Sequence, residues 1–129
     1  MTKKRNSKSY DRGWQDGRQS IITDRRYNGW TNYETWNVNL WIDNDQGSQE
    51  YWRERAGEAY EQAIEEAHIT RLGNASIALS DQLKADYEEN MPELTGTYAD
   101  LLRGALSEVN WYEIAENMVL AYKSENSPV

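Results

Sequence analysis

The sequence lacks cysteine altogether and holds a single histidine, His68. The absence of cysteine excludes disulfide frameworks, cysteine-ligated zinc sites and thiol nucleophiles. One histidine argues against multi-histidine metal sites and histidine-paired catalytic triads. Long apolar runs are also missing, and the N-terminus has no hydrophobic signal core. We therefore expect a soluble, cytoplasmic protein that spans no membrane, needs no metal or other cofactor and is not an enzyme, so that binding is the leading hypothesis.

Aliphatic side chains are scarce as well. Leu, Ile and Val together number 20 among 129 residues, and there is no Phe, a composition that by itself is typical of disordered chains. Six Trp and nine Tyr offset the shortage, because each large aromatic side chain buries about 150–250 Å². The length suits one domain, so we expect a folded domain with a small core.

Charge is distributed unevenly along the chain. Residues 1–28 hold eight basic and three acidic side chains, a net of +5, and the remaining residues hold six basic and nineteen acidic ones, a net of −13. This asymmetry indicates a charged tail attached to a folded body. We predict a largely flexible basic arm over residues 1–28, an acidic helical domain over 29–123 and a polar tail over 124–129. The basic residues of the arm are Lys3, Lys4, Arg5, Lys8, Arg12, Arg18, Arg25 and Arg26.

The acidic domain has the residue pattern of an all-α fold, with about five short helices in a small compact bundle. Thr31 followed by Glu34 is typical of a capping box, and it places the start of the first helix just after Trp30. The spacing of apolar residues then predicts one stripe on this helix. The stripe is expected to comprise Tyr33, Trp36 and Leu40, with Val38, Trp41 and Ile42 beside it.

The second helix is expected to begin with Ser48 as its cap and to run to about Ala67. Gly73 is a natural helix terminator, and Asn74 or Ser76 is expected to open a third helix. The packed face of the second helix is predicted to be smooth because most of its members are small. That face comprises Trp52, Ala56, Ala59, Ala63 and Ala67.

Two further capping patterns predict the last two helices. Thr97 with Asp100 indicates the start of a fourth helix, and Asn110 with Glu113 indicates the start of a fifth. The tryptophans of the domain mostly fall on the predicted core faces. We expect one or two of them to be exposed as binding anchors instead, and the sequence does not distinguish which.

An acidic stripe is the most distinctive feature of the predicted second helix. Five glutamates advance by four, four, three and four residues, so they share one face. At 1.5 Å per residue the row is about 22 Å long, with a carboxylate about every 6 Å, a spacing comparable with that of phosphates on a DNA strand. One hypothesis is a protein-binding surface that mimics nucleic acid, and the alternative is a solvated face that keeps the protein soluble. The stripe comprises Glu50, Glu54, Glu58, Glu61 and Glu65.

Two other features, a single histidine and an acidic segment, suggest a catalytic residue and a calcium site, but neither pattern is complete. His68 is expected near the C-terminal end of the second helix, where its protonated form would interact favourably with the helix dipole, but no catalytic partner accompanies it. The segment from Asp43 to Glu54 has part of a calcium-loop pattern. Gly47 and Ser48, however, stand where such loops need an oxygen ligand and a glycine. We predict an acidic turn between helices rather than a calcium site.

The basic arm supports a different hypothesis, direct nucleic-acid binding. Its lysines and arginines alternate with Tyr10, Trp14 and Tyr27, which would combine phosphate contacts with base stacking. The acidic body would repel the same polyanion, and no recognised nucleic-acid-binding motif is present. In the alternative interpretation the arm folds back on the acidic body of its own chain or of a neighbouring copy, which leaves a homodimer open.

Two blocks of sequence resemble a signature of small uncharacterised proteins of bacteriophages and plasmids. The first, W-T-N-Y-x-T-W-x-V, begins at Trp30, and the second, S-E-V-N-W-x-E-I-A, begins at Ser107. The resemblance extends from Gly29 to about Ala121 and implies neither an activity nor any site residues. It implies a mobile-element context, in which small acidic proteins often occupy host machinery that handles nucleic acids.

The sequence therefore predicts a non-enzymatic binding protein of a phage or mobile element. Its acidic helical surface would engage a basic host protein that handles nucleic acid or serves in defence. The first alternative is a nucleic-acid-binding protein that acts through residues 1–28. A hydrolase or metal enzyme is the remaining alternative.

Overall fold

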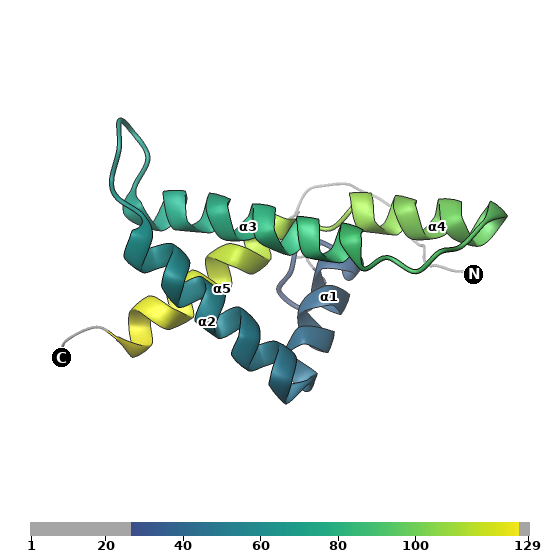
Figure 1. The fold of residues 1–129 in the computed structure, drawn as a ribbon, viewed down its shortest axis with the longest axis horizontal. Coiled ribbons are helices and arrows are strands. Elements are labelled where there is room, and N and C mark those ends of the chain that lie inside the picture. The colour runs from purple at the N-terminus through teal and green to yellow at the C-terminus, as the bar shows by residue number, and fades with distance from the viewer. Residues whose placement is uncertain (1–26, 127–129) are drawn as a thin grey trace, which may run out of the picture.

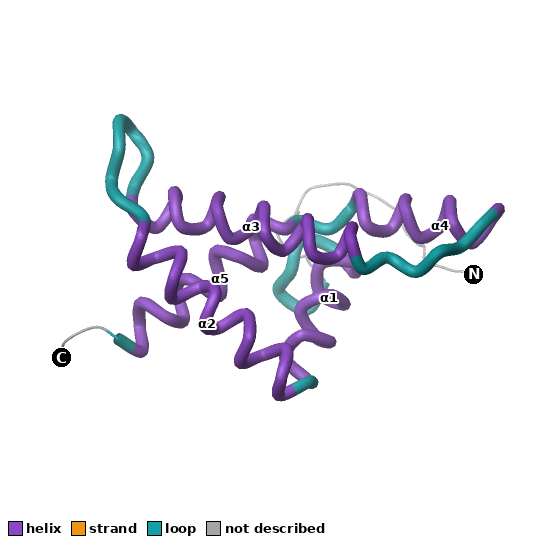
Figure 2. Tube along the Cα trace, in the orientation of Figure 1, coloured by secondary structure: helices purple, strands orange, loops and turns teal. Residues whose placement is uncertain are grey.

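The computed structural model describes residues 27–126, and within that range the chain forms five helices and no β-strand (Figures 1 and 2). The predicted all-α bundle of about five helices is confirmed. The basic residues of the predicted arm all lie outside the described range. None of the helices within it is long and apolar enough to cross a membrane. The helices are α1 (Tyr33–Asn44), α2 (Gln46–Gln62), α3 (Arg71–Glu89), α4 (Gly96–Ser107) and α5 (Trp111–Glu125).

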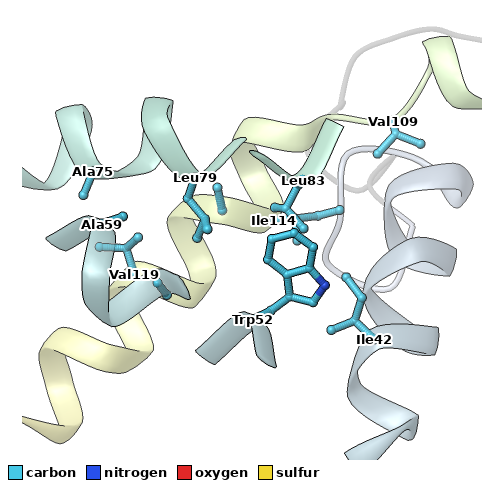
Figure 3. Close-up of a cluster of buried hydrophobic side chains, with 11 residues drawn as sticks. Ile42, Trp52, Ala59, Ala75, Leu79, Leu83, Val109, Ile114 and Val119 are labelled. Carbon is cyan, nitrogen blue, oxygen red and sulfur yellow. The ribbon is translucent and has the colours of Figure 1, made fainter. Parts of the chain in front are cut away.

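The core lies where α2, α3 and α5 pack against one another, with α1 resting on α2 and α5. Figure 3 shows Trp52 of α2 between Ile42 of α1 and Ile114 of α5, with Leu79 and Leu83 contributed by α3. Small residues of α2 and α3 let these helices approach closely, as predicted for the second helix. The buried hydrophobic cluster comprises Ile42, Trp52, Ala56, Ala59, Ala75, Leu79, Leu83, Val109, Ile114, Ala115 and Val119.

The first helix begins one residue later than its capping pattern predicts. Asn32, not Thr31, is the N-cap, because its side-chain oxygen accepts a hydrogen bond of 2.9 Å from the backbone N–H of Thr35. The buried face also differs from the predicted stripe. Thr35 and Ile42 are completely enclosed, whereas Tyr33 is 49% exposed.

A tight turn outside the predicted elements precedes α1. Asn28 and Gly29 both have positive φ angles, and Tyr27 and Trp30 exchange two backbone hydrogen bonds across them. An Asn-Gly pair is well suited to such a turn because both residues tolerate the left-handed region. The turn brings the ring of Tyr27 to within 5.0 Å of the ring of Trp36, between centroids. Tyr27, predicted as a stacking residue of the arm, thus packs on the helical body.

The junction between α1 and α2 is a single residue, Asp45. Its carboxylate accepts a hydrogen bond of 2.7 Å from the backbone N–H of Ser48, so Asp45 is the cap of α2 and Ser48 lies inside the helix. The neighbouring carboxylate of Asp43 accepts a hydrogen bond from the Asn39 amide. The predicted acidic turn is therefore limited to Asp45, because the residues on either side of it belong to α1 and α2.

Of the three later helices, α5 begins where its capping pattern predicts, and α3 and α4 begin earlier than predicted. Asn110 caps α5 by accepting a hydrogen bond of 3.0 Å from the backbone N–H of Glu113, as predicted, and the helix continues two residues past Lys123. Thr70 caps α3, so Gly73 lies within its first turn rather than ending the preceding helix. The cap of α4 is Thr95, two residues before the predicted one.

The tryptophans divide as expected between core and surface. Trp52 is 5% exposed and belongs to the core, whereas Trp41 is 65% exposed. Trp30 and Trp111 are partly buried against the core cluster. Trp41 is therefore the exposed tryptophan among those of the helical domain.

Candidate functional site: an acidic groove between two helices

An open groove of about 530 Å³ runs along α2 and is bounded on its other side by the C-terminal end of α5. Five carboxylates and one guanidinium line it, so the charge at its surface is strongly negative. Four of the carboxylates come from the predicted stripe, and α5 adds a fifth, which no spacing pattern on α2 predicts. The charged lining residues are Glu50, Arg53, Glu54, Glu58, Glu61 and Glu125.

The ring of Tyr122 also lines the groove and lies directly against Gly57. A Cβ atom at residue 57 would lie only 2.8 Å from Cε1 of this ring, so the close approach of α5 to α2 requires glycine there. The Tyr122 hydroxyl donates a hydrogen bond of 2.7 Å to the Glu61 carboxylate. This bond, reinforced by partial burial of the ring, raises the pKa of Tyr122. The groove thus combines an aromatic surface with a rim of carboxylates.

Two arginines of the chain already bind glutamates of α2. Arg55 forms two hydrogen bonds of 3.1 Å with the Glu58 carboxylate, and its guanidinium carbon lies 4.8 Å from the centroid of the Tyr51 ring. The hydrogen bonds with Glu58 raise the pKa of Arg55. Arg71, the first residue of α3, makes a 3.3 Å ion pair with Glu61. Arg55 also contacts the Glu54 carboxylate at 3.2 Å, so two guanidinium groups are shared among three of the four groove glutamates of α2 and the row keeps a net negative charge.

The N-termini of α1 and α5 form a second constellation of polar residues. The Thr35 hydroxyl donates a hydrogen bond of 2.6 Å to the Asn32 side chain and accepts one of 2.8 Å from the backbone N–H of Asn110. Asn32 in turn donates to the carbonyl of Glu108 at 2.7 Å. The backbone N–H of Thr31 donates to the Glu113 carboxylate. The two helix starts therefore hold each other in place, which is a structural role rather than a site for chemistry.

Residues 23–121 match the model of a family described as a family of unknown function, DUF7249. The chain belongs to this family. The match takes in α1 to α4 entirely and α5 as far as Ala121. No curated protein and no solved structure matches the chain.

The fifth residue of the predicted stripe does not join the groove in this DUF7249 protein. The second helix ends at Gln62 rather than near Ala67, so Glu65 lies in the segment that leads to α3. Two side chains of α3 bind carbonyls at and just after the C-terminal end of α2 and so fix where that helix ends. Arg71 donates to the carbonyl of Tyr60 at 2.9 Å, and Asn74 donates to the carbonyl of Ile64 at 2.8 Å. The row on α2 is therefore about 17 Å long rather than 22 Å.

His68 is also displaced from its predicted helix end. It is exposed in a tight turn in which Glu66 and Ile69 exchange two backbone hydrogen bonds and Ala67 has a φ of 54°. The imidazole does not line the groove. Within residues 27–126, no three His, Cys, Asp or Glu side chains are grouped so that they could hold a metal ion.

Proposed function

We propose that this DUF7249 protein is a non-enzymatic binding protein whose groove between α2 and α5 receives a basic segment of another protein. The observation that carries the proposal is the lining of the groove, in which five carboxylates and a single guanidinium surround the ring of Tyr122. Opposite charge steers a basic partner toward such a surface and disfavours an acidic one.

An arginine or lysine suits the groove in shape as well as in charge. Its apolar stem can lie along the Tyr122 ring while its charged end reaches Glu54 or Glu58 at the rim. The chain binds its own arginines in this way. Arg71, for example, places its guanidinium carbon 4.0 Å from the centroid of the Tyr60 ring while it pairs with Glu61.

The more specific form of the proposal is that the protein belongs to a phage or mobile element and mimics nucleic acid. The glutamates on α2 form a row of carboxylates spaced comparably with backbone phosphates. A basic host protein that binds nucleic acid, in replication, repair or defence, would bind this row through the same residues that contact backbone phosphates. The resemblance of the two sequence blocks to phage and plasmid proteins supports this context.

The first experiment is a capture from bacterial lysate with the full chain, tagged at its C-terminus, with and without nuclease. We expect a protein partner that survives nuclease treatment and is released by high salt, because exposed charge pairs are screened. Loss of all captured material on nuclease treatment would favour the alternative function, nucleic-acid binding through the basic residues of the arm.

A matched pair of triple variants then tests the groove itself. One carries Glu54→Lys, Glu58→Lys and Glu61→Lys in the groove. The other makes the same change in net charge outside it, at the exposed residues Asp81, Glu89 and Glu93. We expect the first variant to lose the partner and the second to keep it, while circular dichroism shows equal helix content in both. Equal binding by the two variants would contradict the proposal.

A further inference from the structure

Helix α4 stands apart from the other four helices. Those four pack against one another, whereas α4 makes no extensive contact with any of them. Figure 1 shows α4 extending away from the rest of the molecule at the end opposite the junction of α2 and α3. Its N-terminal end, at Gly96, is the end farther from the body.

The helix nevertheless carries an apolar stripe. Tyr98 is 74% exposed and Leu101 is 65% exposed, and the spacing of Tyr98, Leu101 and Ala105 places all three on one face. Ala99, in contrast, is buried. We call Tyr98, Leu101 and Ala105 the α4 stripe. Leu94, 41% exposed in the preceding loop, adds to the apolar surface of this part of the molecule.

The α4 stripe contains no residue that is charged at neutral pH, although the described part of the chain is strongly acidic. Asp100 and Arg103 are the two charged residues of α4, and they form an ion pair of 3.7 Å with each other. At about 100° per residue, both positions lie more than about 120° around the helix from the centre of the stripe. The α4 stripe offers no carboxylate to a basic segment and no cation to a polyanion. Another uncharged face is therefore the electrostatic complement of the stripe.

We propose that two copies of the chain associate through the α4 stripe, as an antiparallel pair of α4 helices around a two-fold axis near Leu101. The shape of the stripe is complementary to itself in this orientation. Its bulky residue, Tyr98, lies toward one end, and Gly104 and Ala105 lie toward the other. Apart from the backbone of α4 and the two adjacent residues, no atom lies within 4 Å of the position that a Cβ would occupy at Gly104. The antiparallel arrangement therefore sets the large side chain of each copy against the small residues of the other.

The antiparallel arrangement also separates the two acidic bodies. Each body adjoins the C-terminal end of its own α4, so the bodies lie at opposite ends of the helix pair, about 18 Å apart along the axis. The Debye length at physiological ionic strength is about 8 Å, so the repulsion between the bodies is largely screened. Each copy contributes roughly 400 Å² of surface, so the total of about 800 Å² falls below the roughly 1,200 Å² of stable interfaces and the association is weak and transient. This association is independent of the function proposed for the groove.

Sedimentation velocity of the full chain tests the proposal, with Leu101→Lys as the variant and Leu120→Lys as its matched control. Leu120 is 44% exposed on α5, so both substitutions replace an exposed leucine and add the same charge. We expect a dimer with a dissociation constant on the order of 100 µM. Leu101→Lys should weaken it at least about tenfold, and Leu120→Lys should leave it unchanged. A wild-type chain that stays monomeric at several hundred micromolar, or equal effects of the two variants, would overturn the proposal.

Because the chain has no cysteine, single cysteines report the geometry directly. Leu101→Cys places two thiols near the two-fold axis, where an added oxidant can join them, whereas Leu120→Cys provides the same thiol away from it. We expect a disulfide-linked dimer from the first variant and much less from the second. Equal cross-linking of both variants would show random collision and would contradict the proposed pairing.

Discussion

Gly57 determines, at the scale of one residue, how closely α5 approaches α2. We expect Gly57→Ala to destabilise the protein by about 1–2 kcal/mol, because the new Cβ would lie 2.8 Å from the Tyr122 ring and would displace it from its bond with Glu61. Chemical denaturation measures the change. Gly47→Ala on the same helix is the control, since its nearest neighbour would lie at 3.6 Å. That change should be neutral or stabilising by up to about 1 kcal/mol, and a similarly neutral Gly57→Ala would show that the ring moves freely.

The two tyrosines with raised pKa values predict how stability changes in alkali. The hydrogen bond to Glu61 raises the pKa of Tyr122 above the ordinary value of 10.0, and burial raises that of Tyr87, with the charge of Asp86 adding to it. A tyrosine whose pKa is raised on folding stabilises the protein fully while its hydroxyl is protonated in both states, below pH 10. This stabilisation is lost as the pH rises through the pKa of the folded state. We therefore expect resistance to urea to fall above pH 10. The fall should be less steep in Tyr122→Phe, and identical pH profiles in the two proteins would contradict this assignment.

The connection between α1 and α5 matters at the scale of whole elements. We expect Thr35→Val to cost about 2–3 kcal/mol, because valine keeps the shape but leaves the backbone N–H of Asn110 and the side chain of Asn32 without their hydroxyl partner. Thr35→Ser keeps the hydroxyl and loses a buried methyl group, so it should cost only about 1 kcal/mol. Thermal and urea denaturation distinguish the two. A serine variant no more stable than the valine variant would show that packing, not hydrogen bonding, dominates at this position.

The same connection explains why the inward face of α1 was wrongly predicted from sequence. Capping is local, and the Asn110–Glu113 pattern correctly located the start of α5. The burial of Thr35, however, depends on its contact with Asn110, 75 residues away. Apolar spacing gave more weight to Tyr33 and Trp36, which instead pack with Tyr27 in an aromatic group on the outer side of the helix.

The candidate site was predictable to the extent that it lies on one helix. The spacing of four glutamates was enough to place them on one face of α2. The loss of Glu65 from that face was not predictable, because no glycine or proline marks the end of α2 and the hydrogen bonds from Arg71 and Asn74 fix it. The contribution of Tyr122 and Glu125 depends on the packing of α5 against α2, which a sequence pattern does not contain.

Charge repulsion dominates the electrostatics at the scale of the whole molecule. Nineteen acidic and six basic side chains lie within residues 27–126. The ion pairs of Arg55, Arg71 and Arg103 are at the surface, where such pairs contribute about 0–1 kcal/mol each. These attractions are too small to offset the repulsion among the remaining carboxylates at low ionic strength.

Stability should therefore rise with salt. Raising sodium chloride from about 0.01 M to about 0.15 M shortens the Debye length from about 30 Å to about 8 Å, which screens the carboxylates from one another. We expect a gain of about 1 kcal/mol, or an increase in Tm of about 4–8 °C, in thermal denaturation at fixed protein concentration. The variant with lysine at Asp81, Glu89 and Glu93 carries less net charge, so its Tm should rise less over the same range. A Tm that falls with salt would mean that the arginine–glutamate pairs of α2, rather than the net charge of the body, dominate the electrostatic free energy of the fold.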